Sequence, residues 1–376
     1  MKQYDLAIVG AGMLGLSHAL AAARKGLNVL VLEADRQAEG ASIRNFGMFL
    51  PMGMPEGDSY HRAMHSREIL VPLLREIGLW SDPSGSLTVA HHDDEMQVLS
   101  EFCKRTAHGR HHCQLLNRLQ ILERCPSLNP EGVVGGLFSD TEITLNPRLL
   151  IPALTRYLRQ QHGVDFRFGH RVTDIRLPEV QTTREVFRTS HVVVCTGAGF
   201  DSLYPDVHER HLSRCKLQML RTAPQPDGVR LPAMMITGLS LAHYQAFAGC
   251  PSIGQLQHRL AKDYQQYLDY GIHILHAQHN DGSVLIGDSH EYDEQISPFH
   301  KAQIEQLILA GSRDVLNLPT SVLMERWTGY YAKAKTGHCF QREISPGILL
   351  VNGVGGTGMT TGLALAVDGL NDFLNG

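Results

Sequence analysis

The sequence lacks a long hydrophobic run, and no apolar stretch approaches the roughly 18 residues that a membrane-spanning helix needs. It also lacks a basic excess: 34 Lys and Arg stand against 38 Asp and Glu, a formal charge of −4. Nucleic-acid-binding proteins usually carry a basic surface. The opening MKQYDLAIVG has Asp5 within its apolar run, which predicts a β-strand rather than a signal peptide. We therefore expect neither a membrane span nor a nucleic-acid partner.

Paired cysteine motifs and metal-ligand spacings are also missing. The seven cysteines are scattered, and none stands in a CxxC pair. Without a secretory signal, this odd number predicts free thiols and a cytoplasmic protein. His61 and His65 lie four residues apart on a predicted helix, but no third ligand with convincing spacing accompanies them. We therefore predict no metal site.

The first motif that is present follows an apolar run at residues 4–10. Its sequence is Gly-Ala-Gly-Met-Leu-Gly at 10–15, and it opens a predicted helix at 13–26. The next predicted strand, 28–33, ends in Glu33. Glycines at these places allow a tight turn, close approach of a pyrophosphate to the backbone and helix–strand contact. A carboxylate at the position of Glu33 suits ribose hydroxyls and disfavours NADP, so the pattern predicts dinucleotide binding.

A second glycine-rich segment closes the sequence. Residues 352–359, Asn-Gly-Val-Gly-Gly-Thr-Gly-Met, join the apolar ILLVNG segment to a predicted helix at 362–374. Such a turn offers a second helix N-terminus, whose dipole would stabilise negative charge on a reduced flavin pyrimidine. This turn changes the prediction from a dinucleotide in general to FAD. A glycine-rich turn without a ligand is the alternative.

The order of the remaining segments predicts an α/β fold (α+β overall). Residues 214–221, 243–248, 272–279 and 283–288 are predicted strands, and Asp281-Gly282 before the last is a hairpin signal. We expect a discontinuous Rossmann-like FAD-binding domain and an interleaved, mainly antiparallel β-sheet substrate domain. The first is predicted to comprise 1–48, 140–212 and 338–376, and the second 49–139 and 213–337.

Over nearly its whole length the sequence resembles the D-amino-acid oxidase, glycine oxidase and sarcosine oxidase superfamily of flavoproteins. The opening motif, the closing VNGVGGTGMTTG and HVVVCTGAG at 191–199 carry this resemblance. It implies FAD extended across the nucleotide domain, with the substrate over the flavin ring against a β-sheet. The motifs and the resemblance together predict these cofactor-binding residues: Gly10, Gly12, Met13, Leu14, Gly15, Glu33, Ala34, Ser42, Arg44, Asn45, Gly47, Thr196, Gly197, Gly353, Gly355, Gly356, Thr357, Gly358 and Met359.

A narrower resemblance concerns the substrate. SIRNFGMF, HAQHNDGSVLIGDSHEY and RWTGYYAK look like a clade associated with the breakdown of 2-aminoethylphosphonate-type compounds. Arg44 has a planar fork that suits phosphonate or carboxylate oxygens, and Lys333 and Lys335 add positive charge. The alternatives are a structural or FAD-contacting role for Arg44 and a solvated segment for the two lysines.

Side-chain alternation along 273–279 places His276 and Gln278 on one strand face, and His273, Leu275, Ala277 and His279 on the other. We predict that the His276 face looks toward the flavin, with polar residues facing solvent as the alternative. His276 is also a candidate for proton handling, because its reference pKa is near neutrality. Trp327, Tyr330 and Tyr331 either form an aromatic wall around an amine or pack in a core. The predicted catalytic residues are His276, Tyr330 and Arg44, and the predicted substrate-binding residues are Arg44, Gln278, Trp327, Tyr330, Tyr331, Lys333 and Lys335.

These features predict an FAD-dependent oxidoreductase acting on CH–NH or CH–NH2 groups. The expected substrate is a small primary or N-methylated amine with an anionic group. Its imine would hydrolyse to an aldehyde or oxo acid, and O2 or another acceptor would take the electrons. One alternative is an FAD-dependent hydroxy-acid dehydrogenase that passes electrons to a quinone or carrier. Another is a non-catalytic flavoprotein subunit.

Overall fold

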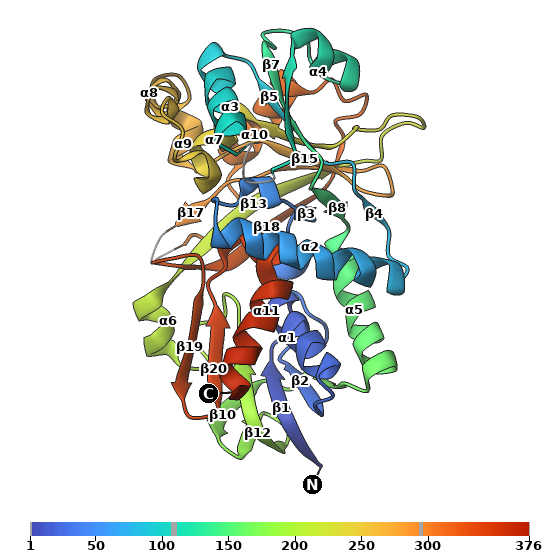
Figure 1. The fold of residues 1–376 in the computed structure, drawn as a ribbon, viewed down its shortest axis with the longest axis vertical. Coiled ribbons are helices and arrows are strands. Elements are labelled where there is room, and N and C mark those ends of the chain that lie inside the picture. Colours follow the sequence, from blue (N-terminus) through green and yellow to red (C-terminus); the bar gives the residue numbers. More distant parts are fainter. Residues whose placement is uncertain (1, 107–110, 293–295, 376) are drawn as a thin grey trace.

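The computed structural model describes residues 2–106, 111–292 and 296–375 (Figure 1). Two large sheets organise the chain, one in each half of the view. Both ends of the chain lie in the half that contains β1, β12 and β20. No helix in the described ranges is long and apolar enough to cross a bilayer.

The first sheet has a parallel centre. It contains β1 (Gln3–Val9), β2 (Val29–Glu33), β9 (Asp165–Phe168) and β12 (Val186–Val194), with β20 (Ile348–Asn352) beside β12. The antiparallel strands β10 (Val172–Arg176), β11 (Glu179–Thr182) and β19 (Phe340–Ser345) extend it. Strands from the start, middle and end of the sequence therefore lie side by side.

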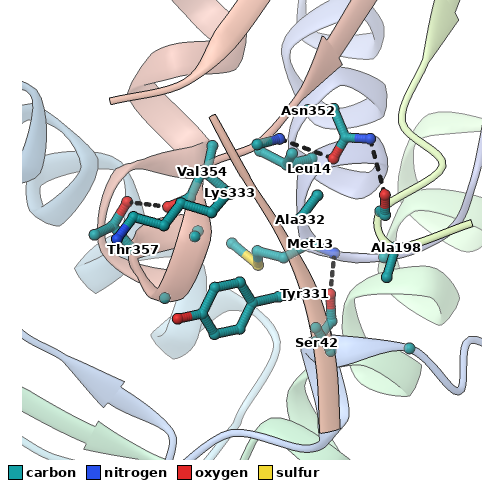
Figure 2. Close-up of a pocket in the computed structure, with 18 of the residues that line it drawn as sticks. Met13, Leu14, Ser42, Ala198, Tyr331, Ala332, Lys333, Asn352, Val354 and Thr357 are labelled. Atoms are coloured by element: carbon teal, nitrogen blue, oxygen red, sulfur yellow. Dashed lines mark hydrogen bonds between the residues drawn. The ribbon is translucent and has the colours of Figure 1, made fainter. Parts of the chain in front are cut away.

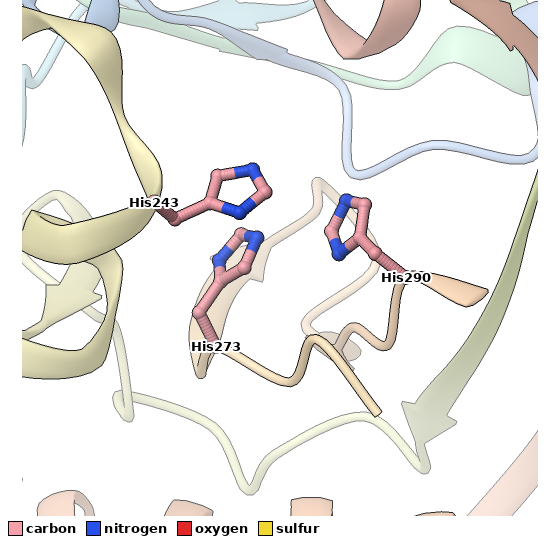
Figure 3. Close-up of side chains that lie close together, drawn as sticks. All are labelled: His243, His273 and His290. Atoms are coloured by element: carbon pink, nitrogen blue, oxygen red, sulfur yellow. The ribbon is translucent and has the colours of Figure 1, made fainter. Parts of the chain in front are cut away.

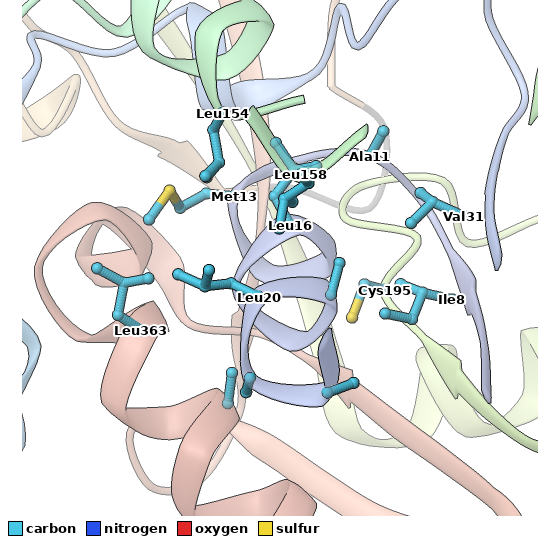
Figure 4. Packing of buried hydrophobic residues seen from close by; sticks show 14 of the residues in the cluster. Ile8, Ala11, Met13, Leu16, Leu20, Val31, Leu154, Leu158, Cys195 and Leu363 are labelled. Atoms are coloured by element: carbon cyan, nitrogen blue, oxygen red, sulfur yellow. The ribbon is translucent and has the colours of Figure 1, made fainter. Parts of the chain in front are cut away.

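Both faces of β1 are buried, which explains its continuous apolar run. Leu6 and Ile8 face one hydrophobic cluster, whereas Ala7 and Val9 face another. On the first face α1 (Met13–Arg24) packs against α5 (Pro147–His162) and α11 (Gly358–Asn375), and α11 contacts α2 (Asp58–Glu76). Figure 4 shows Leu16 and Leu20 of α1 in this cluster, near side chains of α5 and α11. The packing fixes the N-terminal end of α1 against the sheet.

The second sheet is mainly antiparallel. Its order is β17 (Glu291–Tyr292), β13 (Leu212–Thr222), β16 (Val284–Gly287), β15 (Leu275–Gln278), β14 (Met234–Thr237), β5 (Ser86–Ala90), β7 (Gly135–Ser139) and β6 (Cys113–Asn117). The long strand β18 (Leu323–Ala334) pairs with β13, and only β14 and β5 run parallel. The predicted fold class, an α/β protein with a mainly antiparallel second sheet, is confirmed. The predicted domain boundaries stay a prediction.

The remaining elements surround the second sheet or connect the two sheets. The helices are α3 (Asp93–Thr106), α4 (Arg118–Arg124), α6 (Pro205–His211), α7 (Gly238–His243), α8 (Ile253–Asp263), α9 (Gln265–Asp269) and α10 (Ala302–Val315). Short 3-10 turns occupy η1 (Ala41–Ile43), η2 (Pro51–Gly53), η3 (Gln245–Phe247) and η4 (Gly355–Thr357). A third, small sheet contains β3 (Met48–Phe49), β4 (Ser81–Asp82) and β8 (Ile143–Leu145).

One predicted strand is wrong. Residues 243–248 end α7 and then form η3 instead of extending. Ala246 and Phe247 are buried in the cluster around α3 and α8, so tertiary packing explains the apolar character of this segment. The predicted hairpin is present, with β15 and β16 paired in antiparallel register from Leu275 opposite Gly287 to Gln278 opposite Val284.

Candidate active site

A cavity of about 950 Å³ lies where the two sheets meet. The N-terminal glycine motif and the C-terminal glycine turn line it, as do residues of β13 and β18 from the second sheet. Figure 2 shows Met13 and Leu14 opposite Tyr331 and Lys333 of β18, with Val354 and Thr357 nearby. The cavity is therefore built by segments far apart in the sequence.

The N-terminal glycines are required by backbone contact. Gly10 has φ +104°, and a Cβ added there would lie 2.4 Å from the carbonyl oxygen of Cys195. A Cβ on Gly15 would lie 1.9 Å from the carbonyl oxygen of Gly10. Gly12, the N-cap of α1, has no side chain to cap the helix. The first turn of α1 thus sits directly on the end of β1, with its N–H groups at the cavity.

Two polar side chains fix the turn between β1 and α1. Glu33 Oε2 accepts a hydrogen bond of 2.8 Å from the Ala11 amide, and Oε1 accepts one of 3.0 Å from the Asp35 amide. Burial raises the pKa of Glu33, and these hydrogen bonds oppose that shift. Ser42 Oγ accepts a hydrogen bond of 2.8 Å from the Met13 amide (Figure 2). Glu33 therefore links the ends of β1 and β2 at the cavity edge.

The C-terminal turn is attached to both sheets. Asn352 Nδ2 donates to the Gly197 carbonyl at 2.9 Å, and Asn352 Oδ1 accepts from the Gly353 amide at 2.8 Å. The Ala334 amide at the end of β18 donates to the Gly353 carbonyl at 2.8 Å. Thr357 Oγ1 donates to the Val354 carbonyl at 2.7 Å. These bonds place the start of α11 beside the last residues of the substrate strand.

All but one of the predicted cofactor-binding residues line this cavity. The exception is Gly47, which has φ +75°, and whose added Cβ would lie 2.0 Å from the Leu145 carbonyl oxygen. This glycine is needed for close backbone packing, so its predicted place at the cofactor is wrong. The cavity-lining residues of the prediction are Gly10, Gly12, Met13, Leu14, Gly15, Glu33, Ala34, Ser42, Arg44, Asn45, Thr196, Gly197, Gly353, Gly355, Gly356, Thr357, Gly358 and Met359.

Comparison with known proteins decides the family, since the family described as DAO, FAD dependent oxidoreductase, matches residues 5–367. The chain belongs to this family of FAD-dependent oxidoreductases. The predicted superfamily, cofactor and enzyme class are thereby confirmed; glycine oxidases and other members act on CH–NH groups. The narrower phosphonate clade is not part of that confirmation.

Individual relatives are distant but cover most of the chain. One of the two named subunits of an opine oxidase from Rhizobium meliloti is 26% identical over 93% of this chain and 88% of its own length. Glycerol 3-phosphate dehydrogenase of Caloramator mitchellensis is 22% identical over 97% of this chain and 72% of its own. The crystal structure of glycine oxidase from Geobacillus kaustophilus superposes with a TM-score of 0.80, at 16% identity and with 100% and 95% coverage. At that identity the structural likeness establishes the fold alone.

The cavity fits the FAD that the family requires. Thr196 Oγ1 lines it, is buried, and has no hydrogen-bond partner among the described residues. The N-termini of α1 and α11 both meet the cavity, so their N–H groups offer two sites for acceptor groups. A Cβ added to Gly356 would meet nothing within 4 Å, which leaves open space beside the second turn. These residues would hold FAD, which supplies two-electron redox chemistry when bound.

We expect Glu33→Gln to weaken FAD binding by about tenfold, since a charge-assisted hydrogen bond contributes about 1.5 kcal/mol or more. The amide keeps one acceptor oxygen but loses the negative charge and one hydrogen bond of the turn. Fluorescence titration of the apoprotein with FAD measures this dissociation constant.

Asp5→Asn is a matched control for Glu33→Gln, because Asp5 also accepts a backbone amide, that of Asn28 at 2.8 Å, but does not line the cavity. The dissociation constant of FAD should not change in this variant. Equal affinity of Glu33→Gln and wild type would remove Glu33 from the cofactor site.

The substrate end of the cavity combines positive charge with phenols. Arg44 is half-buried and donates to the Thr328 carbonyl at 3.1 Å. The hydroxyls of Tyr331 and Tyr292 are 3.1 Å apart, and Lys333 Nζ lies 3.4 Å from the Tyr292 hydroxyl. Burial raises the pKa of both tyrosines, so both hydroxyls stay protonated at neutral pH. Tyr330 and Lys335 also line the cavity, although Lys335 donates to the Glu209 carbonyl at 2.7 Å.

The predicted orientation of the strand at 273–279 is wrong. His276 and Gln278 do not line the cavity, whereas His273 and Leu275 do. His276 is buried and its Nε2 lies 2.8 Å from Ser312 Oγ of α10, because α10 covers that face of the sheet. Gln278 is bonded to the backbone of Leu231, Val229 and Gly282. His276 is therefore no longer a candidate for proton handling, nor Gln278 for substrate binding.

The predicted cavity contact of Trp327 is wrong as well. Its Nε1 donates to the Arg44 carbonyl at 3.1 Å, and the guanidinium of Arg148 lies 4.9 Å from the ring centre. Trp327 is absent from the cavity lining. It therefore fixes the backbone of Arg44 from behind the cavity wall. The roles assigned to Arg44, Tyr330, Tyr331, Lys333 and Lys335 stay predictions.

Four cavity-lining residues escaped the sequence analysis: His243, His273, Asp288 and His290. The alternation along 273–279 put His273 on the opposite face from His276, but it did not say which face the cavity takes. His243 ends α7, in a segment that was expected to be a strand. His61 and His65 belong to no group of three potential metal ligands within the described ranges.

Proposed function

We propose that this enzyme oxidises a small primary or N-methylated amine that carries a phosphonate or carboxylate group. The substrate loses two electrons and two protons, and the product is an imine. Water converts the imine to an aldehyde or oxo acid and releases ammonia or methylamine. O2 is the proposed electron acceptor and gives hydrogen peroxide. The seven free thiols support a cytoplasmic location.

The observation that carries this proposal is the position of Arg44. Its guanidinium has five N–H donors, yet only one hydrogen bond, to Thr328, involves a described residue. The side chain lines the cavity and is half-buried. A planar fork with free donors binds two oxygens of a carboxylate or phosphonate at once. Arg44 therefore supports an anionic rather than a neutral substrate.

The phenols of Tyr292 and Tyr331 give the cavity its second character. Both line the cavity together with Tyr330, and their hydroxyls stay protonated. Aromatic faces and hydroxyl oxygens accept a small amine while keeping water from it. The chain's own residues thus bind the anionic group, orient the amine and exclude water. Orientation of a reactive carbon by bound ends of a substrate lowers the barrier for oxidation.

A dehydrogenase of a hydroxy acid is the second candidate. It is favoured by the similarity to a glycerol 3-phosphate dehydrogenase, whose named substrate carries a hydroxyl and an anionic group. The same Arg44 would bind that anion. A non-catalytic flavoprotein is the third candidate, since one relative is a subunit of opine oxidase.

Anaerobic bleaching of the flavin absorbance tests these candidates. We expect 2-aminoethylphosphonate or its N-methyl form to bleach purified enzyme, and readmitted O2 to restore the colour and give peroxide. Glycine, sarcosine, D-alanine and a hydroxy acid complete the panel. Bleaching by glycine or D-alanine but not by the phosphonates would contradict the phosphonate substrate.

Two further results of the panel separate the alternatives. Bleaching by the hydroxy acid alone, with turnover only on an artificial dye acceptor, would favour the dehydrogenase. A yellow protein that no compound bleaches would favour the non-catalytic flavoprotein.

A further inference from the structure

Three imidazole rings meet at one wall of the cavity (Figure 3). They belong to His243 at the end of α7, His273 before β15 and His290 before β17. One ring nitrogen from each lies within 4.8 Å of the others. Ring centres are 4.0 Å apart for His243 and His273, 4.7 Å for His243 and His290, and 4.8 Å for His273 and His290. Three separate segments of the chain thus bring three nitrogen donors together.

A buried carboxylate completes this group. Asp288 Oδ1 lies 3.6 Å from His273 Nε2, and Asp288 Oδ2 lies 3.7 Å from His290 Nε2. These distances exceed a hydrogen bond. They are close to the edge of a tetrahedron of ligands around Zn²⁺, which is about 3.4 Å for bonds of about 2.1 Å. The spacing therefore leaves room for an ion between the carboxylate and the imidazoles.

The donor atoms are buried without partners. His273 is 3% exposed and Asp288 is 6% exposed, and neither His273 Nε2 nor Asp288 Oδ1 has a hydrogen-bond partner among the described residues. A buried carboxylate without a counter-charge is costly. A divalent cation would satisfy both atoms at once.

The surrounding backbone orients the ligands. His290 Nδ1 lies 3.0 Å from the Gly271 carbonyl, to which it donates, so its Nε2 presents a lone pair. The amide of Asp288 donates to the His273 carbonyl at 3.0 Å, which holds these two residues opposite each other. Ser240 Oγ lies 3.4 Å from His273 Nδ1 on the side away from Asp288. This outer layer of contacts is typical of metal-bound histidines.

We propose that His243, His273, His290 and Asp288 bind one divalent transition-metal ion of the Zn²⁺ class. Three imidazoles and one carboxylate form a set of borderline donors that suits Zn²⁺, Co²⁺ or Fe²⁺ rather than Mg²⁺ or Ca²⁺. The site lies in the cavity wall, with His243 open to the cavity and His273 buried behind it. The ion would add positive charge next to Tyr331 and Lys333. The inference rests on this geometry and does not depend on which substrate is oxidised.

Metal analysis of the holoenzyme tests the site. The chelator-treated, FAD-loaded protein is incubated with Zn²⁺, passed through a desalting column and analysed by elemental mass spectrometry. We expect about one Zn²⁺ per chain for the wild type. His243→Ala and His290→Ala should each lower the bound metal at least tenfold, with unchanged flavin content. Substitution by Co²⁺ should give the visible bands of a tetrahedral complex, beyond the flavin absorbance.

The double variant His61→Ala/His65→Ala is the matched control, because these histidines lie on α2 and belong to no three-ligand group in the described ranges. It should keep the full equivalent of Zn²⁺. Absence of bound Zn²⁺ in the wild type, full retention in His243→Ala and His290→Ala, or loss in the double variant would each overturn the proposal. Asp288→Asn should lower the Zn²⁺ affinity at least tenfold, and an unchanged affinity would overturn the role of the carboxylate.

Discussion

Gly15→Ala is expected to give a protein that retains less than a tenth of the wild-type FAD. The added methyl group would lie 1.9 Å from the Gly10 carbonyl oxygen and 3.3 Å from Ile8. Backbone cannot yield as a flexible side chain can, so the start of α1 must move away from β1. Overpacking of this kind costs about 1–3 kcal/mol in stability. The same movement displaces the N–H groups that meet the phosphates, so FAD binding falls as well.

Flavin absorbance per chain and thermal unfolding measure this effect. Gly254→Ala is the control, since Gly254 is exposed on α8 and its added Cβ would meet nothing within 4 Å. That variant should keep its FAD and unfold at the wild-type temperature or slightly above it. A yellow Gly15→Ala protein of normal stability would contradict the backbone contact and the phosphate site together.

Arg44→Ala is expected to raise the KM for an anionic amine by about 10- to 100-fold, because a hydrogen-bonded ion pair contributes about 1.5–3 kcal/mol. The substitution gives up one side-chain hydrogen bond, to Thr328, and keeps the backbone carbonyl that Trp327 holds. The fold should therefore persist. Steady-state kinetics at saturating FAD, with an anionic and a neutral amine compared, measure the effect.

Two variants make the test of Arg44 specific. Arg44→Lys keeps the charge but loses the planar fork, so part of the increase in KM should remain. Lys335→Ala should leave KM near the wild-type value, because Lys335 is exposed and already bonded to the Glu209 carbonyl. An unchanged KM for the anionic amine in Arg44→Ala would remove Arg44 from substrate binding. An equal increase for the neutral amine would point instead to a disturbed flavin.

The nucleotide half of the site was predictable because its chemistry is local. Gly10 and Gly15 stand within one turn between a strand and a helix, where the Cβ of residue 15 would meet the Gly10 carbonyl. Strand alternation, glycine spacing and the carboxylate at Glu33 are all readable without a tertiary structure. The C-terminal turn was readable for the same reason.

The substrate half depends on contacts distant in sequence. Alternation divided 273–279 correctly into two faces, but α10, which comes later in the chain, covers the His276 face through Ser312. Likewise Arg148 of α5 lies against Trp327 and holds it outside the cavity. His243 and His290 lie in segments whose placement is set by packing around α7 and the hairpin. No local pattern states which of two faces a later helix will cover.

The order of strands in the first sheet has a consequence for how the protein is made. β1 is synthesised first, but its neighbour β12 begins only at Val186, and β20 begins only at Ile348. The parallel pairs at the centre of the sheet therefore form between segments that leave the ribosome at very different times. Such non-local pairing is slow, and the unpaired edge of β1 is exposed until its partner arrives. Cofactor loading must follow synthesis of the C-terminal turn, which makes FAD capture a late event in the maturation of this chain.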